Sequence, residues 1–84
     1  MKNPYHGLKP GTVPSEQFEL LLAGTSIRSV ALIAALRDHL VNGITATEAW
    51  TKHGINPSQF SRRLAVLQTE SERSRKLSRF YQQG

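Results

Sequence analysis

Paired helix-start and helix-stop signals constrain the fold of this 84-residue chain more than any other feature of its sequence. Three times, a residue whose side chain can cap a helix N-terminus precedes a segment that a glycine then closes. These pairs are Ser15 with Gly24, Ser26 with Gly43, and Thr45 with Gly54. They predict helices at about 15–23, 26–42 and 45–53. Alternation of apolar and polar residues with a period of two, which would indicate strands, is absent from the sequence, so we expect an all-α fold.

Two further start signals lie in the last third of the chain. Asn56 precedes Pro57, and proline is well suited to the first position of a helix. Thr69 and Glu72 have the spacing of a capping box. The sequence therefore predicts a small domain of about five helices. Their inward faces carry Phe60, Leu64 and Leu67 in the fourth helix, and Leu77, Phe80 and Tyr81 in the fifth.

The N-terminal residues 1–14 differ in composition from the rest. They hold three of the four prolines and few apolar side chains, which is typical of an extended or flexible arm. Residues 15–84 then form a single small domain. A core of this size is marginal, so we expect a partner subunit to add stability.

The predicted helix 26–42 is apolar around most of its circumference, which indicates burial on nearly every side. In so small a chain, such a helix is expected to serve both the core and a subunit interface. Arg37 and Asp38 interrupt the apolar run, as an interfacial or capping ion pair or as a plain exposed pair. The residues that we expect to mediate oligomerisation are Leu21, Leu22, Ile33, Leu36, Asp38 and Leu40.

Several classes of protein are disfavoured by what the sequence lacks. There is no cysteine, and the longest strongly apolar run, residues 30–36, is too short to span a bilayer. The N-terminus has no apolar signal-peptide core, so we expect a cytoplasmic protein without a membrane partner. The three histidines lack metal-ligand spacing, and no catalytic motif is present. We therefore expect no enzyme activity, cofactor, metal site or small-molecule substrate.

The positive charge is confined to the C-terminal part of the chain. Residues 1–51 contain four Lys or Arg and four Asp or Glu, whereas residues 52–84 contain seven and two. A one-sided basic surface suits a polyanion, and nucleic acid is the commonest one. From charge alone, a basic surface that only aids solubility is an equally good interpretation.

The two helices around Gly54-Ile55-Asn56 have the spacing of a helix-turn-helix. Ala49 is expected to allow close approach of the helices, and Trp50 to lie in the core rather than on DNA. An ordinary pair of packed helices with a polar outer face is the alternative. The residues that we expect to contact DNA are Ser58, Gln59, Ser61, Arg62 and Arg63 on the second helix, with Thr47, Lys52 and Arg73 on flanking phosphates.

The sequence from about residue 8 to 81 resembles the PapB-type regulators of fimbrial (adhesin) biosynthesis. The matching segments are LKPG at 8–11, FELLL at 18–22, SIRS at 26–29, RDHLVNG at 37–43 and EAWTKHGIN at 48–56. The resemblance implies an oligomeric, nucleoid-associated bacterial protein that binds AT-rich regulatory DNA of fimbrial operons and either activates or represses them. A weaker similarity is to the KorA-like plasmid repressors.

The chain departs from the family pattern in the predicted helix-turn-helix. Ala46 and Trp50 stand where the family has a basic residue and a cysteine, and Arg62 and Arg63 replace threonines. These changes predict that DNA contacts have moved from the helix at 45–53 toward the one that follows Pro57.

Two other functions remain open at the level of sequence. One is a helical adaptor whose basic segment 69–81 binds an acidic protein or a membrane, although its apolar face is short for membrane residence. The other is RNA binding, which the core positions expected for the aromatic residues disfavour. The function that the sequence favours is a DNA-binding transcriptional regulator of a fimbrial or adhesin operon that acts as a homo-oligomer.

Overall fold

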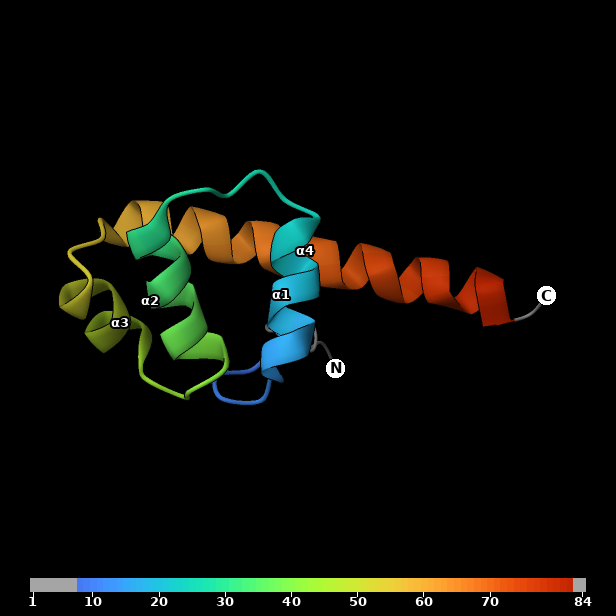
Figure 1. Cartoon of the computed structure of the whole chain (residues 1–84), viewed down its shortest axis with the longest axis horizontal. Coiled ribbons are helices and arrows are strands. Elements are labelled where there is room, and N and C mark those ends of the chain that lie inside the picture. Colours follow the sequence, from blue (N-terminus) through green and yellow to red (C-terminus); the bar gives the residue numbers. More distant parts are fainter. Residues whose placement is uncertain (1–7, 83–84) are drawn as a thin grey trace.

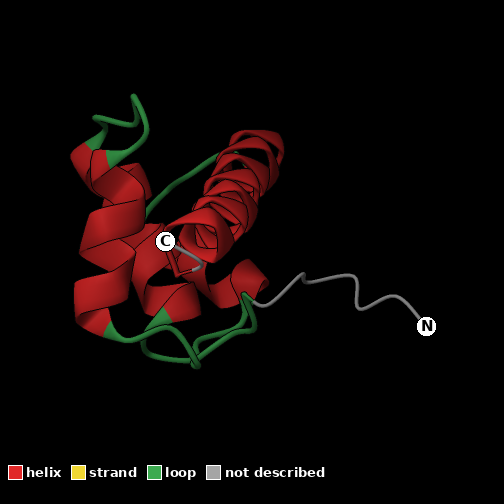
Figure 2. Cartoon of the chain, turned by 90° about the vertical axis from the view of Figure 1, so that its right-hand side faces the viewer, coloured by secondary structure: helices red, strands yellow, loops and turns green. Residues whose placement is uncertain are grey.

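The structure, a computed structural model, describes residues 8–82 of the chain and their side chains as far as Arg73. Four helices follow one another: α1 (Ser15–Ala23), α2 (Val30–Leu40), α3 (Ala46–Lys52) and α4 (Pro57–Gln82) (Figure 1). Across residues 8–82 there is no strand (Figure 2). The predicted all-α class is confirmed, but the number of helices is four rather than about five.

The fourth and fifth predicted helices are one continuous helix, α4. The capping box proposed at Thr69 and Glu72 is therefore wrong as a helix start, because a cap needs non-helical backbone at its first residue. No glycine or proline interrupts the chain between Pro57 and Gln82. Since most of these residues have good intrinsic helix propensity, nothing forces a break.

The second helix begins later than the sequence predicted. Ser29, not Ser26, is its N-cap, and the Ser29 hydroxyl accepts a hydrogen bond from the Leu32 N–H at 3.3 Å. The preceding loop is shaped by Ile27, which is buried in the core. Arg28 reinforces the loop, because its guanidinium donates to the carbonyls of Thr25 and Ile27. Burial of Ile27 thus keeps residues 26–28 out of α2.

The start of α1 also differs in detail from the prediction. Pro14 occupies the cap position without a side-chain bond, and Ser15 is the first helical residue. The predicted stop at Gly24 is confirmed, since Gly24 is the C-cap and its N–H donates to the Leu21 carbonyl.

All four helices share a single apolar core. Helix α4 runs along the long axis of the molecule, and α1 and α2 cross it, with α3 near its N-terminal end (Figure 1). The C-terminal part of α4 extends beyond the other helices (Figure 1). The predicted apolar face at Leu77, Phe80 and Tyr81 lies outside the side chains that are described. The largest fully buried side chains are Phe18, Phe60, Leu8, Leu32, Leu36, Leu40 and Leu67.

The segment 8–14, which the sequence assigned to the arm, lies against the C-terminal end of α2. Leu8 and Val13 are buried in the core. The Gly11 N–H donates to the His39 carbonyl, and the Val13 N–H to the Leu40 carbonyl, both at 3.1 Å. These two bonds satisfy carbonyls that the end of a helix leaves without an intrahelical partner. Residues 1–7 of the predicted arm lie outside the described residues.

A glycine contact holds this segment against the turn between α2 and α3. Gly11 and Gly43 both have left-handed backbone, with φ of 72° and 80°. Their backbones meet so closely that a Cβ on Gly11 would lie 2.9 Å from the Gly43 Cα. At Gly11, only glycine combines a left-handed φ with the absence of a Cβ that would collide with the Gly43 backbone.

Candidate nucleic-acid interface

Helix α3 begins with the predicted cap. The Thr45 hydroxyl accepts a hydrogen bond from the Glu48 N–H at 3.2 Å. The same hydroxyl donates to the Glu48 carboxylate, also at 3.2 Å. The predicted cap at Thr45 is confirmed.

A short turn joins α3 to α4. His53 is the C-cap of α3, and Gly54 follows with a left-handed φ of 66°. The Ile55 N–H then donates to the Trp50 carbonyl at 2.8 Å, which closes the turn. This is the turn glycine that the spacing predicted.

The start of α4 is fixed by Asn56. Its side-chain oxygen accepts hydrogen bonds from the Ser58 N–H at 2.8 Å and the Gln59 N–H at 3.4 Å. Pro57 is the first residue of α4 and loses no bond there. The predicted start signal at Asn56 and Pro57 is confirmed.

Phe60 anchors the first turns of α4 to both neighbouring helices. Its ring is 1% exposed and makes edge-to-face contacts with Trp50 and His39, at centroid separations of 5.6 and 5.7 Å. Ala49 is fully buried at the side of α3 that meets the core. Trp50 is partly buried against the same cluster, so the prediction that this indole packs against the core is confirmed.

The five residues predicted to contact DNA from this helix are all exposed. Four of them, together with Asn56, line a surface concavity of about 530 Å³. Neither Arg62 nor Arg63 forms an ion pair with any described residue. The concavity is lined by Asn56, Ser58, Gln59, Arg62 and Arg63, while Ser61 is exposed nearby.

The three predicted flanking residues have different surroundings. Thr47 is exposed on α3. Lys52 has its Nζ 3.5 Å from an Asp38 carboxylate oxygen, and Arg73 lies at the same distance from Glu70. Arg73 is also ten residues beyond Arg63, or about 15 Å along the helix. Both cations are therefore partly neutralised, and Arg73 lies apart from the concavity.

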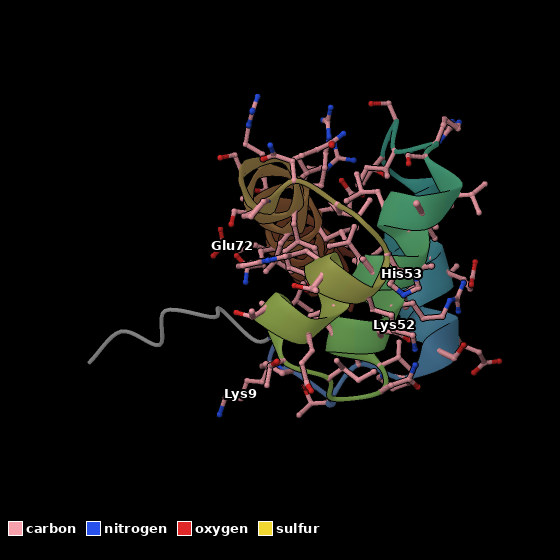
Figure 3. All side chains as sticks on the ribbon, turned by 90° about the vertical axis from the view of Figure 1, so that its left-hand side faces the viewer. Lys9, Lys52, His53 and Glu72 are labelled. Atoms are coloured by element: carbon pink, nitrogen blue, oxygen red, sulfur yellow. The ribbon has the colours of Figure 1, made fainter. Side chains whose placement is uncertain are left out.

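A polar cluster that the sequence did not predict surrounds Asp38. Its carboxylate accepts from the His53 Nε2 at 2.7 Å and from the Asn42 amide at 2.9 Å. The hydrogen bond from His53, with a smaller contribution from Asn42, lowers the pKa of Asp38 below its ordinary value. Lys52 and His53 come from the same end of α3 (Figure 3). Two features of the sequence could have indicated this cluster. They are the acidic residue Asp38 in an otherwise apolar helix and the histidine His53 directly before the turn glycine.

Arg37 and Asp38 do not pair with each other within the protomer. Arg37 instead pairs with Glu19 of α1, and its guanidinium lies over the Phe18 ring, 4.9 Å from the centroid. The adjacent polar residues of α2 thus bind two different helices, Arg37 toward α1 and Asp38 toward α3.

The residues assigned to oligomerisation lie mostly inside the protomer. Leu21 of α1 and Leu36 and Leu40 of α2 are buried in its own core, because these two helices pack against each other and against α4, and α2 also against α3. They are not available on the surface, which corrects the expectation for these three. Leu22 and Ile33 are partly buried, and Asp38 is engaged within the chain. The exposed large apolar side chains among the described residues are Leu20, Val30 and Val66.

The described residues contain no group of three or more His, Cys, Asp or Glu that could hold a metal ion. They contain no helix long and apolar enough to cross a membrane. What they do present is an all-helical domain with two uncompensated guanidinium groups on one exposed helix face. Such a combination is typical of small regulatory proteins that bind nucleic acid.

Comparison with known proteins identifies the family. The chain belongs to the PapB family, described as adhesin biosynthesis transcription regulatory proteins, which it matches over residues 1–81. It is 41% identical over 71 residues to the F1845 adhesin operon regulatory protein of Escherichia coli, covering 84% of each chain. It is 42% identical over 66 residues to the regulatory protein FanB of Escherichia coli, covering 79% of this chain and 67% of FanB.

A solved structure supports the same assignment. The crystal structure of Escherichia coli FocB superposes with a TM-score of 0.83 at 32% identity, covering 88% of this chain and 84% of FocB. The named relatives are regulatory proteins, not enzymes. The predicted membership in the PapB family of transcription regulators is thereby confirmed.

Proposed function

We propose that this chain binds double-stranded DNA through the exposed face at the start of α4 and so regulates transcription of an adhesin or fimbrial operon. The observation that carries the proposal is that the guanidinium groups of Arg62 and Arg63 have no acidic partners among the described residues. They lie beside Gln59 on a helix that Phe60 fixes to the core. In this proposal, α3 and α4 form a helix-turn-helix.

The side chains of this face have complementary roles. Arginine binds guanine or a phosphate with two parallel hydrogen bonds, and glutamine pairs in the same way with adenine. The hydroxyls of Ser58 and Ser61 suit phosphate oxygens. Asn56 is already used as the cap, so its side chain is assigned to the fold and not to DNA. Thr47 and Lys52 would contact flanking phosphates, with Asp38 reducing the contribution of Lys52.

We further propose that the chain acts as a homo-oligomer on AT-rich DNA. Leu20 and Val30 support an oligomer, because they are 75% and 83% exposed on a protomer whose core is already closed. Large apolar side chains left in water favour association when a second copy can cover them. These two residues, with Leu22 and Ile33 at the edge of the core, take the place of the buried leucines as interface candidates.

A titration of AT-rich and GC-rich duplexes of equal length, at low and moderate salt, tests the DNA interface. Arg62→Ala and Arg63→Ala are compared with Lys9→Gln. Lys9→Gln also removes one positive charge, but from an exposed residue of the N-terminal segment, away from α4 (Figure 3). We expect the arginine variants to lose affinity and the control to bind nearly as the parent protein does.

The salt dependence gives an independent check. Each phosphate contact contributes about 0.9 to the slope of log affinity against log salt, so loss of one contact lowers the slope by about that amount. Equal affinities for Arg62→Ala, Arg63→Ala and Lys9→Gln would exclude this face of α4 as the DNA site. An absence of binding to any duplex at low salt would contradict the proposed function itself.

A further inference from the structure

We infer that Asp38 is a positioning residue for DNA binding: its carboxylate holds the C-terminal end of α3, its backbone binds the residue before the α3 cap, and together these contacts set where α4 presents Arg62 and Arg63. The inference rests on the proposed DNA-binding function and adds to it a residue that lies outside the DNA-contacting face. Asp38 is on α2, and its carboxylate lies against Lys52 and His53 at the C-terminal end of α3.

The N-terminal end of α3 is fixed by the backbone of Asp38 and by its neighbour His39. The Ile44 N–H donates to the Asp38 carbonyl at 3.0 Å, and the His39 Nδ1–H donates to the Ile44 carbonyl at 2.8 Å. Both backbone groups of Ile44 are thus bound to consecutive residues of α2. Since Ile44 directly precedes the cap residue Thr45, these bonds place the first turn of α3.

The C-terminal end of α3 is fixed by the Asp38 side chain. One carboxylate oxygen lies 2.7 Å from the His53 Nε2 and 3.5 Å from the Lys52 Nζ, while the other accepts from Asn42. Only 15% of the Asp38 side chain is exposed. A hydrogen bond to a carboxylate that is mostly shielded from water is stronger than one on an open surface. The Asp38 side chain therefore contacts the C-terminal end of α3, while its backbone carbonyl binds Ile44 just before the N-cap residue Thr45.

The position of α3 directly determines the position of α4, the helix proposed to contact DNA. His53 is the last residue before Gly54, and only the turn at 54–56 separates it from α4. In addition, the Phe60 ring lies between His39 on α2 and Trp50 on α3. The distance between α2 and α3 therefore sets the site into which α4 is anchored. A shift of α3 would displace the guanidinium groups two turns into α4.

The sign of the effect separates positioning from simple electrostatics. A carboxylate close to a DNA-binding surface repels phosphate, and this one also neutralises Lys52. If Asp38 acted only through its charge, removal of that charge would strengthen DNA binding and steepen its salt dependence. If it acts through the position of α3, removal weakens binding although the net charge becomes more favourable.

The experiment compares Asp38→Asn with Glu16→Gln on the same AT-rich duplex. Glu16 is an exposed residue in the first turn of α1, and its substitution removes the same unit of charge without touching α3. Thermal unfolding first identifies a temperature at which both variants are fully folded. There, we expect Asp38→Asn to bind about tenfold more weakly than Glu16→Gln, with a salt slope no steeper than that of the parent protein. Binding as tight as that of Glu16→Gln, or a slope steeper by about one contact, would overturn the inference.

His53→Ala extends the test to the other partner. If Asp38 acts through His53, the double variant that carries Asp38→Asn and His53→Ala binds DNA no more weakly than Asp38→Asn alone. If instead the losses of DNA affinity from the two substitutions add, Asp38 does not act through His53. Should Asp38→Asn fail to fold, His53→Ala carries the comparison: weaker binding supports the inference, and parental affinity overturns it. Arg62→Ala, measured in parallel, separates the two proposals. If the parent binds and Arg62→Ala does not, the proposed function stands whatever Asp38→Asn does.

Discussion

Replacement of Gly11 by alanine tests whether the N-terminal segment is part of the folded domain. Gly54→Ala is the matched control, because Gly54 has a similar left-handed φ but no atom within 4 Å of the position of an added Cβ. Alanine in left-handed backbone costs roughly 1–2 kcal/mol. Alanine also lowers the conformational entropy of the unfolded chain, which offsets about 0.4–1 kcal/mol of this cost. Gly54→Ala is therefore expected to lower the free energy of unfolding by about 1 kcal/mol.

Gly11→Ala adds a steric conflict to the same backbone strain. Its Cβ would lie 2.9 Å from the Gly43 Cα and 3.4 Å from the Gly43 nitrogen. Backbone atoms cannot turn away as a side chain can, so the segment or the turn must move. Displacements of this kind in packed regions cost about 1–3 kcal/mol. The total for Gly11→Ala is thus about 2–4 kcal/mol.

Urea unfolding followed by circular dichroism measures the difference. Protein concentration is held constant, since association would otherwise change the midpoint. A thermal scan gives the same comparison, and a difference of 1–3 kcal/mol corresponds to a midpoint about 5–20 °C lower for Gly11→Ala than for Gly54→Ala. Equal stabilities for the two variants would refute the reasoning, because they would show that residues 8–14 do not contact the α2–α3 turn.

Three further predictions concern α4, the aromatic cluster and the acid dependence of stability. Thr69→Pro should cost about 3 kcal/mol or more and reduce helicity, because Thr69 lies inside α4; a neutral effect would indicate a break at that residue. Phe60→Ala should cost about 3–5 kcal/mol in urea unfolding, because the ring fills the space between His39 and Trp50; a loss below 1 kcal/mol would contradict that packing. The lowered pKa of Asp38 means that its contribution is complete above the pKa of the unfolded chain and is lost as pH falls through the folded value. Asp38→Asn should therefore lose less stability on acidification than the parent, and parallel pH profiles would contradict the cluster.

Local signals predicted the helix-turn region well. Thr45, Gly54 and Asn56 act as their residue types suggest, because each needs only a few neighbouring backbone atoms to form a cap or a turn. The exposed polar face of α4 also followed from the sequence, since the spacing of Phe60, Leu64 and Leu67 defines the opposite, inward side. Local chemistry was sufficient wherever the partners were close in the chain.

The same local rules misled where two interpretations were both locally possible. Ser26 and Ser29 are equivalent as caps, and burial of Ile27 decided between them. Thr69 has the spacing of a capping box, but a helix already in progress continues unless a residue stops it. Apolar composition of α2 indicated burial without showing whether the partner was this chain or another.

The sequence by itself determined the all-α class, the turn before α4 and the polar, basic character of the α4 face, because these depend on periodicity and on contacts within a few residues. Only the tertiary structure decided that the segment 8–14 packs against the core, that Leu36 and Leu40 are buried within the protomer, and that Asp38 binds His53. Each of these joins residues from separate elements. Their proximity depends on how the helices cross, which no local pattern specifies.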